Sequence, residues 1–179
     1  LMTVGLLVHQ YSLTKLLRNW VIVYIGNFLG SVFLAWLVKK TGLFGYGPEA
    51  YTPLGNLAIT VAEKKVALLW SEALTRGILC NILVCLAVIM CLSSLTLTGK
   101  IFGIYFPIMA FVASGYEHSI ANMYFIPAGF LAAGKLLTDF GRMWKNLIPV
   151  TLGNLVGGLI IVLFHPQMFR KLLPRQRGH

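Results

Sequence analysis

Residues 113–127 read A-S-G-Y-E-H-S-I-A-N-M-Y-F-I-P, in the middle of a long apolar stretch. Sixteen uncharged residues, 101–116, precede the Glu117-His118 pair, and 16 more, 119–134, follow it. A continuous helix over this stretch would rise about 50 Å, whereas the hydrocarbon core of a bilayer is about 30 Å thick. The stretch must therefore tilt heavily, bend or break. We place a break at Ser114-Gly115, because glycine relaxes the backbone and serine offers a local hydrogen bond.

Glu117 and His118 are ionisable side chains near the centre of this stretch. Ionisable residues inside a membrane segment are costly and mark a functional site by default. Broken helices at that depth occur where the freed backbone lines a cavity or is packed in protein. The alternative is that two short buried helices meet at a turn and that the two side chains only pair with each other.

The composition indicates an integral membrane protein. Of the 179 residues, 58% are hydrophobic and only 11% are charged, whereas a soluble domain carries about 25% charged residues. The net charge is +10, but the basic residues lie between and after the apolar runs. They do not form one amphipathic face, so we expect the lipid bilayer as a partner and no nucleic acid.

The apolar runs predict a single all-α transmembrane domain over residues 1–179. Runs of 19 uncharged residues are long enough to cross a bilayer. We expect residues 41–65 to form a long loop that folds over a mouth of the protein. Asn81 lies inside a span, where it either bonds across helices or lines a pore. The expected spans are residues 1–8 (partial), 19–38, 66–97, 101–134 (broken near 113–118) and 146–164, joined by polar connections at 9–19, 96–100 and 135–145.

The basic tail, residues 165–179, predicts a cytoplasmic C-terminus by the positive-inside rule. The rule is not decisive here, because alternating spans leave seven Lys or Arg residues on each face of the membrane. The expected location is the cell (inner) membrane, which the chain crosses several times.

An internal repeat relates residues 19–30, N-W-V-I-V-Y-I-G-N-F-L-G, to residues 146–157, N-L-I-P-V-T-L-G-N-L-V-G. Both copies contain Gly-x-x-x-Gly, which lets helix backbones approach closely. If the copies run in opposite directions, they form an inverted repeat, and such repeats place the transport site at the midplane, at discontinuous helices. Five positions match at a constant offset of 127: Asn19/Asn146, Val23/Val150, Gly26/Gly153, Asn27/Asn154 and Gly30/Gly157.

The repeat also predicts what precedes this sequence. The break at residues 115–118 comes about 30 residues before the second copy, whereas only 18 residues precede the first copy. We therefore expect the counterpart of the break to lie upstream of Leu1, with the first span and half of the next one missing.

At these motifs the chain resembles the formate/nitrite transporter family of pentameric anion channels for formate, nitrite or hydrosulfide. The resemblance rests on F-V-A-S-G-Y-E-H-S-I-A-N-M at 111–123, with support from the segments that begin at Asn19, Asn81 and Asn146. It covers essentially the whole chain. It implies an aquaporin-like helical bundle with inverted repeats and broken helices, assembled as a homopentamer.

The resemblance also implies roles for single residues. His118 would be the central pore histidine and Asn122 its polar neighbour. Lys65 would be a vestibule lysine that draws anions in. Other pore residues would be Phe111 at a constriction and Val84 near Asn81 in the narrow apolar part, and structural support would come from Glu117, Asn154 and Gly115. The family's first broken segment, with its pore-lining threonine, is not in these residues.

We therefore expect a passive or proton-coupled channel for small monovalent anions, formate first. Nitrite or hydrosulfide are alternatives within the family, and a non-transporting structural membrane subunit is an alternative of another class. Desolvating a small anion costs many kcal/mol, and a cation at the mouth raises its local concentration. A histidine, with an unperturbed pKa of about 6.5, can supply a hydrogen bond or a proton, so that the anion crosses as the neutral acid.

Nothing in the sequence favours an enzyme. No set of nucleophile, base and orienting residue is visible. A metal site needs three or four convergent ligands, and only Glu117 and His118 lie near each other. We therefore expect no cofactor and no bound metal.

Overall fold

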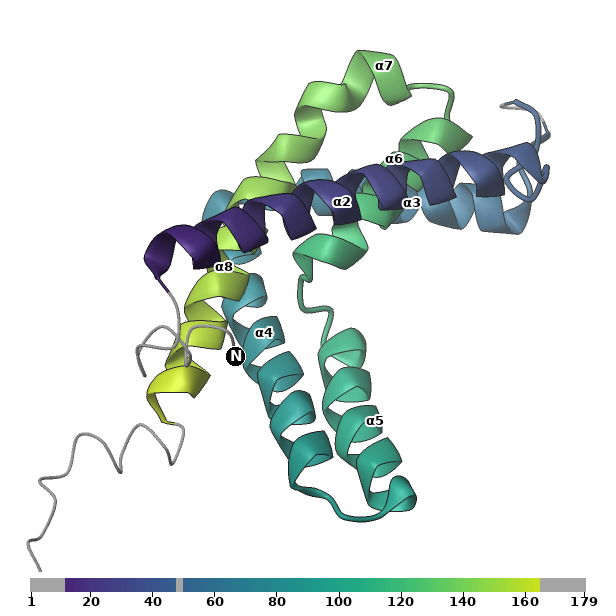
Figure 1. The fold of residues 1–179 in the computed structure, drawn as a ribbon. Coiled ribbons are helices and arrows are strands. Elements are labelled where there is room, and N and C mark those ends of the chain that lie inside the picture. Colours follow the sequence, from purple (N-terminus) through teal and green to yellow (C-terminus); the bar gives the residue numbers. More distant parts are fainter. Residues whose placement is uncertain (1–11, 48–49, 165–179) are drawn as a thin grey trace, which may run out of the picture.

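The computed structural model describes residues 12–47 and 50–164, which form a helical bundle from which α4 and α5 project as a hairpin (Figure 1). The predicted partial span at 1–8 and the basic tail lie outside the described residues. The elements are α2 (Leu13–Lys40), α3 (Pro53–Val66), α4 (Trp70–Ser93), α5 (Leu97–Ala113), α6 (Ser119–Ala132), α7 (Leu136–Asp139), the 3-10 turn η2 (Phe140–Arg142) and α8 (Met143–Leu163).

Three helical stretches of the described residues are long and apolar enough to cross a membrane: Leu13–Lys40, Trp70–Ser93 and Leu136–Ile161. Two shorter apolar helices, α5 and α6, lie between the second and the third. Large apolar side chains are exposed along α2, α4 and α5, as expected where helices face lipid or other membrane-embedded surfaces. The predicted all-α membrane class is confirmed.

The break predicted inside residues 101–134 separates α5 from α6. The C-terminus of α5 closes with a Schellman motif, in which Tyr116 N donates to Phe111 O and Gly115 N to Val112 O, at 3.1 Å each. Gly115 adopts φ +67°, a left-handed conformation that favours glycine. The chain then runs extended through His118, the N-cap of α6. The length of the apolar stretch 101–134 and the glycine at position 115 were therefore sufficient to predict the break.

The prediction that residues 41–65 form a loop is wrong in its second half, because α3 occupies Pro53–Val66. The Thr52 side chain caps the helix by accepting a hydrogen bond from Gly55 N, and Pro53 stands at the first helical position, where its missing N–H is harmless. Ala62 and Val66 are buried against α6 and α8. Pro53 and Gly55 thus belong to the start of a helix and do not indicate a structureless segment.

Several predicted boundaries are also wrong: α2, α5 and α8 begin earlier than predicted because helical turns continue into polar residues, whereas α4 is shorter than predicted at both ends. Helix α2 begins at Leu13, within the predicted 9–19 connection, after a Ser12 N-cap. Helix α4 covers Trp70–Ser93 rather than 66–97, and α5 begins at Leu97 after a Thr96 N-cap, inside the predicted 96–100 connection. The 135–145 connection is mostly α7 and η2, and α8 already begins at Met143.

Helices α4 and α8 pack with their backbones almost in contact. A Cβ on Gly77 would lie 2.8 Å from Val150 O and 3.2 Å from Gly153 Cα. A Cβ on Gly153 or Gly157 would overlap the carbonyl oxygens of Leu74 and Ile78. The Gly-x-x-x-Gly of the second repeat copy is therefore a helix-packing surface, as the sequence predicts.

The two repeat copies lie on α2 and α8, which cross in opposite directions in Figure 1. Tyr24 Oη and Thr151 Oγ1 hydrogen-bond at 3.0 Å, and these residues are separated by 127 positions, the offset of the repeat. A contact between two equivalent residues is what a two-fold axis produces. A two-fold axis that relates the two copies would therefore pass close to this pair of hydroxyls.

Candidate functional site

The candidate site surrounds the break between α5 and α6. The freed backbone of the break is satisfied by α4 and α8: Asn154 Nδ2 donates to Glu117 O at 3.0 Å and to Gly77 O at 2.8 Å, while Asn154 Oδ1 accepts from Ser119 N at 2.9 Å. Non-helical backbone at membrane depth requires such internal partners. Asn154 is thus the residue that ties the break to both neighbouring helices.

Glu117 is the centre of a buried polar network. Its Oε1 accepts from Lys65 Nζ at 2.9 Å, and its Oε2 accepts from Asn122 Nδ2 at 2.6 Å and from Asn146 Nδ2 at 3.2 Å. The side chains of Lys65 and Glu117 are 16% and 5% exposed, so the carboxylate is compensated almost entirely by protein groups. A buried charge is tolerated only with this kind of pairing and hydrogen bonding.

Asn146 joins this network to α3. Its Nδ2 also donates to Lys65 O at 2.9 Å, and its Oδ1 accepts from Asn122 Nδ2 at 2.7 Å. Asn122 Oδ1 is buried and finds no partner among the described residues. Reversing the Asn122 amide would turn that oxygen towards the Glu117 carboxylate, so the observed orientation is the favourable one.

His118 lies half-buried at the N-terminus of α6. Its Nδ1 accepts a hydrogen bond from Ala121 N at 3.3 Å, so the neutral ring carries its proton on Nε2. The Phe111 ring, two residues before the end of α5, stacks beside it with centroids 6.2 Å apart and planes at 30°. The break thus brings a proton donor and an aromatic side chain together at the positive end of a helix dipole.

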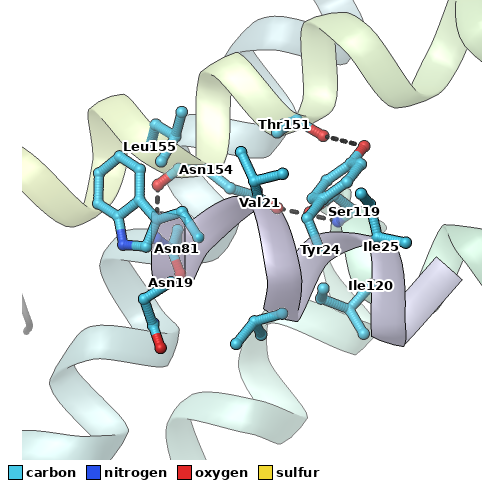
Figure 2. Close-up of a pocket in the computed structure, with 12 residues that line it drawn as sticks. Asn19, Val21, Tyr24, Ile25, Asn81, Ser119, Ile120, Thr151, Asn154 and Leu155 are labelled. Atoms are coloured by element: carbon cyan, nitrogen blue, oxygen red, sulfur yellow. Dashed lines mark hydrogen bonds between the residues drawn. The ribbon is translucent and has the colours of Figure 1, made fainter. Parts of the chain in front are cut away.

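A pocket of about 500 Å³ lies between α2, α4, α6 and α8 (Figure 2). Asn81, Ser119 and Asn154 contribute polar groups to its wall, and Tyr24 reaches from α2 to Thr151 on α8 across it. Asn81 Nδ2 also donates to Asn154 O, so it bonds across helices and borders a cavity at the same time. His118 is not among the described residues that line this pocket.

The structure brings the predicted site residues together in three groups. Lys65, Glu117 and Asn122 form one, Phe111 and His118 the second, and Asn81 and Asn154 the third. Gly115 shapes the turn of the break, and Val84 lies half-buried on α4, three residues after Asn81. Glu117 pairs with Lys65 on α3, not with His118 as in the alternative interpretation.

Sequence reasoning missed Asn146 as a site residue and missed the Lys65–Glu117 pair. A signal for Asn146 was present, because it matches Asn19 in the repeat, as Asn154 matches Asn27. No local signal could have paired Lys65 with Glu117, which lie 52 residues apart in the chain.

Comparisons with known proteins agree with this geometry. The family model described as formate/nitrite transporter matches residues 1–167. A probable formate transporter of Methanothermobacter thermautotrophicus is 44% identical over 171 residues, which are 90% of this chain and 62% of the relative. The formate channel FocA of Haemophilus influenzae is 40% identical over 173 residues, 86% of this chain and 59% of the relative.

Solved structures show the same likeness. A pentameric formate channel with formate bound superposes with a TM-score of 0.72 at 35% identity, over 88% of this chain and 66% of that one. An ion channel of the same family superposes with a TM-score of 0.76 at 30% identity, over 95% of this chain and 65% of that one. The chain thus spans about three fifths of the length of these curated relatives. By its sequence, its broken helix and its fold, the chain belongs to the formate/nitrite transporter family.

Proposed function

We propose that the complete protein containing this sequence conducts small monovalent anions across the membrane, with formate as the first candidate and nitrite and hydrosulfide as alternatives. The observation that carries the proposal is His118 at the helix break, half-buried beside Phe111 and at the N-terminus of α6. The relatives named as formate transporters or channels support formate as the anion.

His118 would meet the anion through Nε2, because Nδ1 caps α6. The positive end of the α6 dipole favours a negative charge at the same place. An arriving anion stabilises the protonated imidazole, and transfer of that proton yields a neutral acid that can pass the apolar constriction. With Nδ1 capping α6, the neutral ring offers the anion only a hydrogen bond from Nε2. The imidazolium forms when Nδ1 takes up a proton and releases Ala121 N, and passing the Nε2 proton to the anion then leaves a neutral ring with its proton on Nδ1.

Lys65 would act at the mouth of the pore on the α3 side. Its ammonium is paired with Glu117 and lies 5.8 Å from the centre of the Phe125 ring. The Lys65–Glu117 pair carries no net charge. Attraction of an anion therefore depends on how far the Lys65 ammonium can turn away from Glu117 and towards the anion. Asn122, Asn81 and Val84 would complete the path around the break.

The assembly and the orientation are part of the same proposal. A homopentamer is supported by the likeness to a solved channel described as pentameric. The chain would cross the cell (inner) membrane several times with its C-terminus in the cytoplasm, as the basic tail predicts.

The test is formate flux into liposomes at several pH values for the wild type and two His118 variants. His118→Phe keeps a ring but no proton, so it should abolish acid-coupled import while fold and assembly survive. His118→Asn should retain some anion passage by hydrogen bonding and lose the pH dependence between about pH 5 and 8. If His118→Phe conducts with the wild-type rate and pH profile, His118 is structural and the proposed mechanism is wrong.

A further inference from the structure

A second group of charged residues lies apart from the Glu117 network, where α3 meets the start of α8. Arg142 Nη2 lies 2.6 Å from Glu63 Oε2, and its Nη1 lies 3.2 Å from Glu63 Oε1 and 2.9 Å from Asp139 Oδ2. The guanidinium also lies 5.7 Å from the centre of the Phe130 ring on α6. One side chain therefore ties α3, α6 and the α7–η2 connection together. We call Arg142, Glu63 and Asp139 the Arg142 cluster.

This cluster is joined to the Glu117 network through two short stretches of chain. Glu63 stands two residues before Lys65 on α3, and Arg142 stands four residues before Asn146, one turn along the chain. Asn146 in turn donates to Lys65 O and to Glu117 Oε2. The end of α3 is thus held to the start of α8 at two successive places, once at the surface and once inside.

The exposure of the cluster indicates that stabilisation is not its main effect. The Arg142 and Glu63 side chains are 39% and 43% exposed, and exposed ion pairs contribute little to folding free energy. The two parallel hydrogen bonds between the Arg142 guanidinium and the Glu63 carboxylate nevertheless fix the relative orientation of the two groups as well as their distance. The single ammonium of a lysine fixes only the distance. The main effect of the Arg142–Glu63 pair is therefore to hold the C-terminal end of α3, which carries Lys65, in place.

We propose that Arg142 is a positioning residue for anion entry: by clamping Glu63 it sets the place of Lys65 relative to Glu117. This inference rests on the proposed channel function for its transport readout. Its direct consequence, the shielding of the Lys65 ammonium, does not depend on transport.

The experiment compares Arg142→Lys, Glu63→Gln and their double variant in the complete protein, with Lys145→Ala as the control. Lys145 is an exposed basic residue three positions after Arg142, in the first turn of α8. Each single variant should raise the formate concentration for half-maximal flux about fivefold and leave the maximal flux unchanged. The double variant should show the same rise of about fivefold, because both changes remove one shared contact. The control should match the wild type.

A second readout measures acylation of lysines by an amine-specific reagent, followed by mass spectrometry. Lys64 is exposed and serves as the internal reference, whereas Lys65 is largely shielded. In Arg142→Lys, labelling of Lys65 relative to Lys64 should rise several-fold. Unchanged relative labelling overturns the positioning role, whether or not the wild type conducts formate. A loss confined to maximal flux, with unchanged half-saturation, also overturns it. Absence of flux in the wild type refutes the channel proposal alone.

Discussion

The two copies of the repeat have similar sequences but very different surroundings. In the second copy, on α8, Gly153 and Gly157 press against the α4 backbone, and Asn154 is 8% exposed with bonds to two other elements. In the first copy, on α2, a Cβ on Gly26 or Gly30 would meet none of the described residues within 4 Å. Among the residues that the structure describes, the Gly-x-x-x-Gly motif thus contacts another helix backbone in the second copy and meets none in the first.

The difference shows what such a motif encodes. Small residues at a spacing of four remove side-chain volume from one face of a helix, so that another backbone can approach. They do not determine which helix approaches. In the second copy the approaching helix is α4, whose Gly77 supplies the complementary gap. The motif permits close packing, and the neighbouring element produces it.

The largest effect is expected from Asn154→Ala, compared with Asn27→Ala at the equivalent place. Asn154→Ala removes the side-chain partner of Ser119 N and Glu117 O at the break, and each buried group left unsatisfied costs about 1–3 kcal/mol. Gly77 O loses only a second bond, because it lies inside α4 and keeps its helical partner. Asn27 is half-buried, and its removal should cost less than about 1 kcal/mol. Thermal unfolding of the purified 179-residue chain in detergent measures both. Equal losses would mean that the two copies are equally engaged, contrary to the structure.

A smaller but clear difference is expected between Gly153→Ala and Gly26→Ala. The new methyl group at position 153 would overlap Leu74 O and force α8 away from α4, at a cost of about 2 kcal/mol. At position 26 the methyl group meets none of the described residues within 4 Å, and the better helix propensity of alanine adds up to about 1 kcal/mol of stability. The same unfolding measurement applies. A marked loss for Gly26→Ala would show that α2 is packed in solution as α8 is.

The smallest effect concerns the contact that the copies share. Tyr24→Phe and Thr151→Val each remove one hydroxyl from a single hydrogen bond, so each should cost about 1 kcal/mol, and the double variant should cost little more than one of them. A double-mutant cycle on unfolding in detergent measures the coupling. Additive losses would mean that the two hydroxyls act independently and do not bond to each other in detergent.

The candidate site was only partly accessible from the sequence. Glu117 and His118 stood out because ionisable residues interrupt an apolar stretch, and that is a local feature. Their partners were not accessible: Lys65 lies on α3, in a segment predicted to be a loop, and Asn146 lies at the start of a helix that begins three residues earlier than predicted. The pairing depends on how α3 and α8 converge on the break, which no local pattern encodes.

By itself the sequence determined the membrane class, the position of the helix break and the internal repeat. Each of these follows from local chemistry: apolar length against bilayer thickness, a glycine able to adopt φ +67°, and small residues at fixed spacing. Only the tertiary structure decided that Glu117 pairs with Lys65 and that Asn154 holds the break. These are contacts between elements 35 to 77 residues apart. They are selected by the need to satisfy buried polar groups and fill space, which depends on the whole arrangement of helices.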